Sequence, residues 1–147
     1  MSDSKVSRFL PWVLIAIVAF IFLQSLPYKF SGHAETKIIF MTIGEWMNGL
    51  GLSSIGELFG QYGGYLIGSL ELVAVILLLL PKTRFYGALL GLGLMSGAIF
   101  FHLFTPLGVV RTIDDAGNTD GGVLFIMACI AWVSSAVLAY LNRPGKS

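Results

Sequence analysis

Glu71 is the only acidic residue inside an apolar stretch of this chain that is long enough to cross a membrane. It lies near the middle of the segment from Tyr65 to Leu80, in which every other side chain is uncharged. An ionised carboxylate at such a depth costs about 2.5 to 3.5 kcal/mol on insertion scales, so it needs a cationic partner, a proton or a water-filled cavity. Because acids inside membranes generally serve a function, Glu71 is the first candidate site residue.

Three other polar side chains are expected to face Glu71, namely Gln24, Lys29 and His102. Side chains lean towards the N-terminus of their own helix. If the helix of Glu71 starts at the outer membrane surface and the helices of the other three start at the inner surface, all four groups converge in the outer half of the molecule. With a small amphipathic molecule bound there, Glu71 would accept a proton, His102 would donate a hydrogen bond to a carbonyl oxygen of that molecule and Lys29 would adjust the local charge.

The same residues also have a structural interpretation. Lys29 can extend to the lipid headgroups or pair with Glu71, and Gln24 can join two helices by a hydrogen bond. His102, close to the membrane surface, can act as a structural hydrogen-bonding group. In that case Glu71 and Lys29 form an ion pair that holds helices together, and no ligand is involved.

The elements that must position these residues are membrane helices. The chain has 147 residues, of which 56% are hydrophobic and 12% charged, and a mean hydropathy of +0.84, which is typical of a small polytopic membrane protein. A helix needs about 20 apolar residues to span the bilayer. Four segments qualify: 9–26, 62–80, 85–104 and 122–141. We therefore predict an all-α membrane protein, a four-helix bundle that forms one domain over residues 1–147.

The distribution of charge predicts the orientation of this bundle. If the N-terminus is cytoplasmic, the cytoplasmic segments contain a single acid, Asp3, and six basic residues: Lys5, Arg8, Lys82, Arg84, Arg143 and Lys146. Acidic residues dominate the opposite side. Because cytoplasmic loops of membrane proteins are enriched in Lys and Arg, we expect both termini to be cytoplasmic and the protein to lie in the cytoplasmic (inner) membrane.

Two loops, 27–61 and 105–121, are then expected on the outer side. In the first, Ile39, Ile43 and Trp46 share one face of an amphipathic helix, which we place at the membrane interface. The glycine-rich segment 49–56 is expected to turn the chain back into the bilayer. In the second, Asp114 and Asp115 lack the spacing of a calcium loop, so we predict no metal site. Trp46, Asp114 and Asp115 are the candidate contacts with a partner protein.

Small residues predict where the helices approach each other closely. Gly64, Gly68 and Glu71 share one face, which directs Glu71 into the bundle. The pairs Gly87/Gly91 and Gly93/Gly97 are spaced for further close contacts, either within the chain or in a homo-oligomer.

Sequence motifs for an intrinsic redox cofactor are not found. Cys129 is the single cysteine, so no thiol pair exists, and His33 lies beyond the first apolar segment, which leaves His102 without a histidine partner for haem. A dinucleotide-binding fingerprint is also missing. Any electrons would therefore come from a soluble or membrane redox partner. Nucleic-acid binding is not expected, because membrane topology explains the basic residues.

Four short motifs resemble those of the DoxX-like family, in order over residues 15–142. They are Tyr28-Lys29-Phe30-x-Gly32, Gly68-x-x-Glu71, the run Leu77 to Pro81 with Arg84 and Gly87-Ala88 beyond it, and Ala98-x-x-x-His102. The resemblance implies four small membrane helices. The family takes its name from the membrane subunit of a thiosulfate:quinone oxidoreductase; other members are linked to oxidative-stress complexes, and similar four-helix proteins assist membrane-protein assembly. The segment from Glu35 to Gly60 is longer than in a minimal member.

These observations support three hypotheses about function. The first is a subunit of a membrane redox system that binds a quinone or a similar amphipathic molecule in the outer half of the bundle. The second is a non-enzymatic assembly factor or accessory subunit that contacts a client protein through its outer loops. The third, a small-solute carrier, is disfavoured because the inner half lacks polar groups and the chain lacks internal repeats.

Overall fold

The structure, a computed structural model, describes residues 3–110 and 116–145. The described part consists of helices and short connections. The helices are α1 (Asp3–Phe30), α2 (Ala34–Gly49), α3 (Ser53–Leu79), α4 (Arg84–Phe104) and α5 (Val123–Leu141). Residues Arg8–Phe30 of α1, together with α3, α4 and α5, are long and apolar enough to cross a membrane. The prediction of a multi-pass membrane protein with four spanning helices is confirmed at this level.

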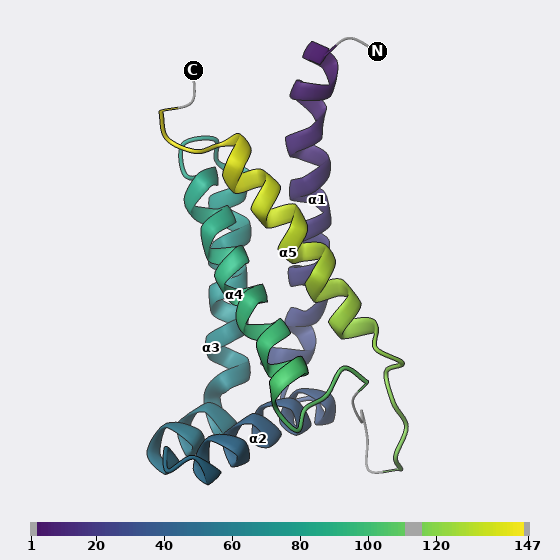
Figure 1. The fold of residues 1–147 in the computed structure, drawn as a ribbon, viewed down its shortest axis with the longest axis vertical. Helices are drawn as coiled ribbons and strands as arrows, with labels where there is room; N and C mark the ends of the chain where they lie inside the picture. The colour runs from purple at the N-terminus through teal and green to yellow at the C-terminus, as the bar shows by residue number, and fades with distance from the viewer. Residues whose placement is uncertain (1–2, 111–115, 146–147) are drawn as a thin grey trace.

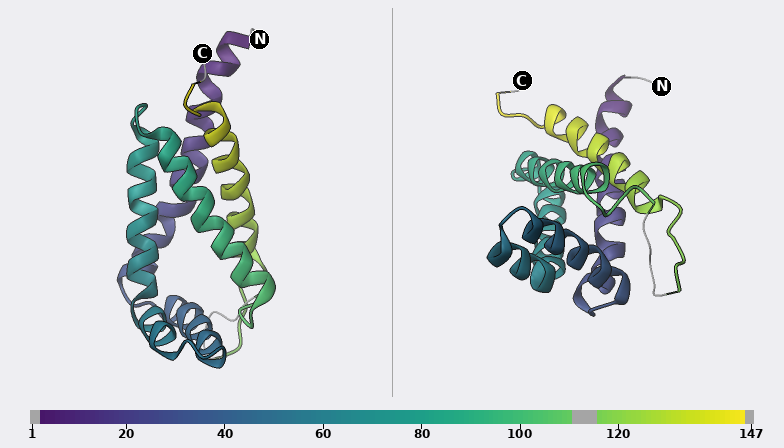
Figure 2. Two further views of the ribbon diagram at one scale, coloured as in Figure 1. Left: turned by 60° about the vertical axis from the view of Figure 1, so that its left-hand side comes forward. Right: turned by 60° about the horizontal axis from the view of Figure 1, so that its bottom comes forward.

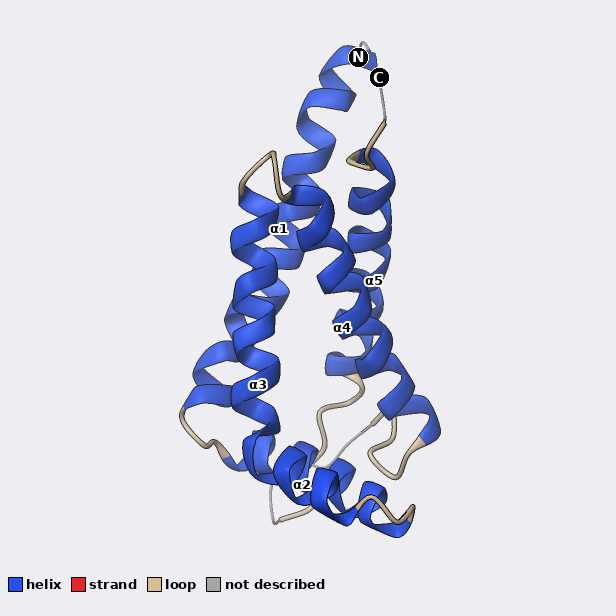
Figure 3. Ribbon diagram, turned by 90° about the vertical axis from the view of Figure 1, so that its left-hand side faces the viewer, coloured by secondary structure: helices blue, strands red, loops and turns tan. Residues whose placement is uncertain are grey.

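The four long helices form a bundle that is closed at one end and spread at the other. Both chain termini lie at the same end, and α2 runs across the opposite end (Figure 1). Near the turn at residues 80–83, α3 and α4 lie side by side, and they diverge towards α2 (Figures 2 and 3). Helix α2 and the beginning of α3 therefore lie across the spread end of the bundle (Figure 2).

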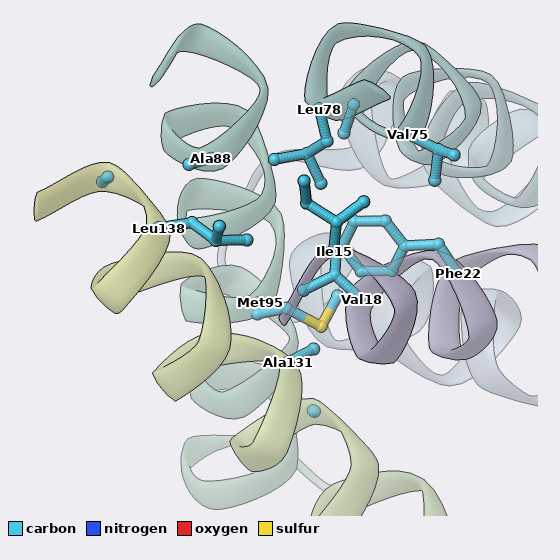
Figure 4. Close-up of a cluster of buried hydrophobic side chains, with 12 residues drawn as sticks. Ile15, Val18, Phe22, Val75, Leu78, Ala88, Met95, Ala131 and Leu138 are labelled. Atoms are coloured by element: carbon cyan, nitrogen blue, oxygen red, sulfur yellow. The ribbon is translucent and has the colours of Figure 1, made fainter. Parts of the chain in front are cut away.

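The tightly packed core lies where the helices converge. It combines large side chains of α1, Ile15, Val18 and Phe22, with small residues of the other spans, such as Ala88 and Ala131 (Figure 4). Except for Ile15, which is 2% exposed, these residues are completely buried. Close contact between helices in lipid depends on such small residues, because no hydrophobic force drives one helix against another there.

Gly87 allows α3 and α4 to approach closely near the turn that joins them. A Cβ atom on Gly87 would lie 2.7 Å from the backbone nitrogen of Leu78 and 2.9 Å from the backbone oxygen of Ala74. The two backbones are therefore in direct contact. The turn is held by Thr83 Oγ1, which donates to the Leu77 oxygen at 2.9 Å, and by Arg84 Nε, which donates to the Leu78 oxygen at 2.8 Å. The short connection makes α3 and α4 antiparallel neighbours.

Two helices extend further than the apolar segments predict. Helix α1 continues through Pro27 to Phe30 instead of ending at residue 26, and α3 starts at Ser53 instead of residue 62. Loss of apolar character marks the edge of the hydrocarbon, and a helix can continue past that edge because its backbone hydrogen bonds are internal. The predicted glycine-rich turn over 49–56 is accordingly shorter, and only residues 50–52 separate α2 from α3.

Gly56, at the start of α3, lies outside the turn that was predicted for it and packs instead against Gly44 of α2. A Cβ atom on Gly56 would lie 2.5 Å from the Gly44 backbone oxygen, and one on Gly44 would lie 2.5 Å from the Gly56 oxygen. These glycines allow α2 and α3 to pack backbone to backbone. Within the segment 49–56, Gly51 alone has the left-handed turn conformation, with a φ of +84°.

Candidate functional site

A cavity of about 280 Å³ lies in the spread half of the bundle. All five helices contribute to its wall, and most of the lining is apolar, including Ile39 and Phe40 of α2. Five residues bring polar groups to this wall: Gln24, Ser25, Lys29, Glu71 and His102. The structure therefore brings together the four residues selected from the sequence and adds Ser25.

The Lys29 ammonium group forms a salt bridge with the carboxylate of Glu71. The Lys29 side chain is 16% exposed and that of Glu71 is 4% exposed, so the pair is largely removed from solvent. Lys29 Nζ also donates to Ser25 Oγ at 3.0 Å, and Ser25 Oγ donates to the Phe22 backbone oxygen at 2.8 Å. The buried carboxylate therefore has a cationic partner, and the orientation of that cation is held by a hydroxyl one helical turn earlier.

Glycines of α3 bring the end of α1 close enough for this contact. A Cβ atom on Gly68 would lie 3.1 Å from Phe30 Cζ and 3.4 Å from Lys29 Cβ. A Cβ atom on Gly64 would lie 2.8 Å from Thr36 Cγ2. The face predicted from the spacing of Gly64, Gly68 and Glu71 is thus the surface on which the last turn of α1 and the start of α2 rest.

His102 is held by the loop that follows α4. Its Nδ1 lies 2.7 Å from the backbone oxygen of Gly108, and its ring packs edge-on against Phe125 with 5.7 Å between the ring centroids. A carbonyl oxygen can only accept a hydrogen bond, so the proton is assigned to Nδ1. His102 is 5% exposed. In the neutral ring Nε2 is the nitrogen left for a ligand, and it is an acceptor.

Gln24 bonds within its own helix. Its Nε2 donates to the Ile21 backbone oxygen at 3.0 Å, so the structure has no hydrogen bond from Gln24 to a neighbouring helix among the described residues. Its amide oxygen remains as an acceptor at the cavity wall.

The predicted glycine pairs of α4 differ in their surroundings. A Cβ atom on Gly91 would lie 2.9 Å from Ser135 Oγ, whereas one on Gly93 or Gly97 would meet no atom within 4 Å among the described residues. Gly93 and Gly97 both line the cavity. They therefore leave open space beside the cavity within this chain, and no helix of the described chain packs against them.

The candidate partner contacts are only partly described. Trp46 packs on two aromatic rings of α4, with its ring centroid 6.1 Å from Phe100 and 6.2 Å from Phe101. Its position is thus explained by contacts inside the chain. Asp114 and Asp115 lie outside the described residues. Within residues 3–110 and 116–145 no group of three or more potential metal ligands occurs.

Ser25 is the polar cavity residue that the sequence analysis missed. Ser25 and Lys29 are spaced i, i+4, so they face the same side of a helix. That spacing could have identified Ser25, but only if α1 were known to continue through Pro27.

The fold and the cavity define a class: a small multi-pass helical membrane protein with a buried ion pair at the wall of a mostly apolar cavity. A scan of protein-family models and searches of curated proteins and of solved structures find no match to the chain. The DoxX-like resemblance therefore stays a prediction.

Proposed function

We propose that this protein is a membrane subunit that binds the head group of an amphipathic molecule, with a quinone as the leading candidate. The observation that supports this most is the cavity itself, where an apolar wall surrounds a few polar groups from α1, α3 and α4. Sites for small molecules usually have this composition. The DoxX-like resemblance of the motifs around Lys29, Glu71 and His102 agrees with it.

The size of the cavity limits the ligand. Cavities that enclose a drug-sized molecule have volumes of roughly 300 to 1,000 Å³, so a volume of about 280 Å³ suits a single ring with small substituents. An apolar tail would have to leave the cavity. Gly93 and Gly97 offer open space for it on the wall formed by α4.

The proposed orientation follows from charge. Both termini and the turn with Lys82 lie at one end of the bundle (Figure 1), and this end has the excess of basic residues that favours the cytoplasm. The cavity and α2 would then lie on the outer side of the cytoplasmic membrane, with α2 at its interface.

A test of this proposal is the identity of the molecules that copurify with the protein. The chain is extracted with its surrounding lipid in polymer-bounded discs, and quinones are quantified by mass spectrometry per mole of protein. We expect the wild type to be enriched over discs that contain an unrelated four-helix protein. Glu71→Gln should lower this enrichment at least about fivefold, since hydrogen bonds to charged groups contribute about 1.5 to 3 kcal/mol. Glu57→Gln, at an exposed position outside the cavity, is the matched control.

Absence of enrichment in the wild type, for quinones and for every other amphipathic molecule detected, would refute the proposal. Equal retention by Glu71→Gln and the wild type would remove Glu71 from the site.

A second candidate function is a non-enzymatic accessory subunit or assembly factor. The direct Lys29–Glu71 salt bridge favours it, because the buried carboxylate is neutralised by the chain itself and needs no ligand. Under this hypothesis the pair stabilises the fold, and binding to a client protein depends on the outer loops.

A further inference from the structure

The polar groups at the cavity wall differ in how much hydrogen-bonding capacity they retain. Lys29 uses two of its three N–H donors, on Glu71 and Ser25. The Ser25 hydroxyl donates to the Phe22 oxygen and accepts from Lys29. Both functions of Ser25 are therefore engaged within α1, and it offers little to a ligand.

The hydrogen-bonding groups that remain unused at the cavity wall are mainly acceptors. Glu71 contacts Lys29 through Oε1, which leaves Oε2. Gln24 donates through Nε2, which leaves its amide oxygen. His102 is committed to Gly108 through Nδ1, which leaves Nε2 as a lone-pair acceptor in the neutral ring. Among the described residues no hydrogen bond reaches any of these three acceptors, and the donors left on the polar residues of the wall are one N–H of Lys29 and one amide N–H of Gln24.

We infer that the cavity selects head groups that donate hydrogen bonds, namely hydroxyl-bearing rings, over rings that only accept. This inference rests on the proposed function and names the ligand class of the same site. It also reverses the role that the sequence suggested for His102. Donation to a ligand carbonyl would require a proton on Nε2, but the Gly108 oxygen holds the proton on Nδ1. For a quinone the reduced, dihydroxy form would bind more tightly than the dicarbonyl form.

Substitution of His102 tests whether the cavity prefers head groups that donate hydrogen bonds. An asparagine side chain places an amide N–H near the position of Nδ1 and nothing at the position of Nε2. His102→Asn therefore keeps a donor for Gly108 and removes the ring acceptor that Gly108 leaves unused. His102→Gln has the opposite effect, because its longer side chain reaches the position of Nε2.

The experiment compares a 4-alkylphenol with its methyl ether, which share one skeleton and differ by one hydrogen-bond donor. Neither probe requires a redox reaction. Binding to the full chain in lipid nanodiscs is measured against the mole fraction of probe, with empty nanodiscs as the background. We expect the phenol to bind the wild type at least about fivefold more tightly than the ether, because an unpaired buried polar group costs about 1 to 3 kcal/mol. In His102→Asn the ratio should fall below about twofold, and His102→Gln should retain part of it.

Each outcome decides a different point. Equal binding of the two probes by the wild type would overturn the inference and leave the proposed function intact. An unchanged preference in His102→Asn, with helicity and a monodisperse elution profile equal to the wild type, would overturn the assignment to His102. Binding of neither probe above background would overturn both the inference and the proposed function.

Discussion

At the scale of residues, the ion pair between Lys29 and Glu71 is the most demanding interaction of the molecule. Transfer of a charge out of water costs several kcal/mol per ion, and a partner compensates for that cost only if the geometry is good. Here the compensation comes from direct contact and from the Ser25 hydroxyl that fixes the cation. Replacement of one member of the pair should therefore lower the free energy of unfolding more than replacement of both members.

We predict that Lys29→Met lowers the free energy of unfolding by about 3 kcal/mol, because it leaves the Glu71 carboxylate buried without a cation. The double variant Lys29→Met/Glu71→Leu should recover most of that loss. Unfolding in mixed detergent micelles, followed by circular dichroism, measures both values. Additive losses in the double variant would show that the two charges do not interact.

The same double variant separates the two candidate functions. If the pair belongs to a ligand site, the refolded double variant should lose the bound amphipathic molecule. If the pair is structural, binding to the client protein should persist at the level of the wild type.

At the scale of elements, glycines act through the backbones they bring together. Gly87 lies against the backbone of α3, and Gly93, on the same helix, has open space where a side chain would be. One substitution should therefore have opposite effects at the two positions.

We predict that Gly87→Ala destabilises the protein by about 1 to 3 kcal/mol, because the added methyl group would meet Leu78 N and Ala74 O and force α3 and α4 apart. Gly93→Ala should be neutral or stabilising by up to about 1 kcal/mol, since alanine favours helix over glycine. The melting temperatures of the two variants, measured by thermal unfolding in the same detergent, are compared with that of the wild type. A destabilised Gly93→Ala would indicate that another protomer packs on that face.

At the scale of the whole molecule, the bundle has two unlike ends. The end with the termini is tightly packed around Phe22 and Leu78, whereas the other end contains the cavity and is bordered by α2 (Figure 2). The cavity therefore lies in one half of the bundle, and the side of the membrane that this half faces depends on the orientation of the chain.

We predict that a cysteine at Leu50, in the exposed turn between α2 and α3, reacts with a membrane-impermeant maleimide in intact cells. A cysteine at Lys82, in the turn between α3 and α4, should react only after permeabilisation. Both are made in a Cys129→Ser background, so that the introduced thiol is the single one in the chain. The reverse pattern would place the cavity on the cytoplasmic side.

Helical periodicity explains why part of the site could be predicted from the sequence. The face shared by Gly64, Gly68 and Glu71 follows from 3.6 residues per turn, and it is the face on which α1 rests. The hydrogen-bond partner of His102 could not be predicted in this way, since Gly108 lies in a loop and adopts a φ of +74°. The periodicity of a helix contains no information about how a loop returns to it.

The sequence by itself determined the number of spanning helices, the inward direction of Glu71 and the polar residues available to it, because length, hydropathy and periodicity are local properties of the chain. Only the tertiary structure decided that Lys29 reaches Glu71 and that the Gly108 oxygen engages Nδ1 of His102. The second contact depends on how the loop after α4 returns to that helix, and the first depends on where α1 ends relative to α3. That position is set by the contact of whole surfaces, such as the last turn of α1 on the glycines of α3.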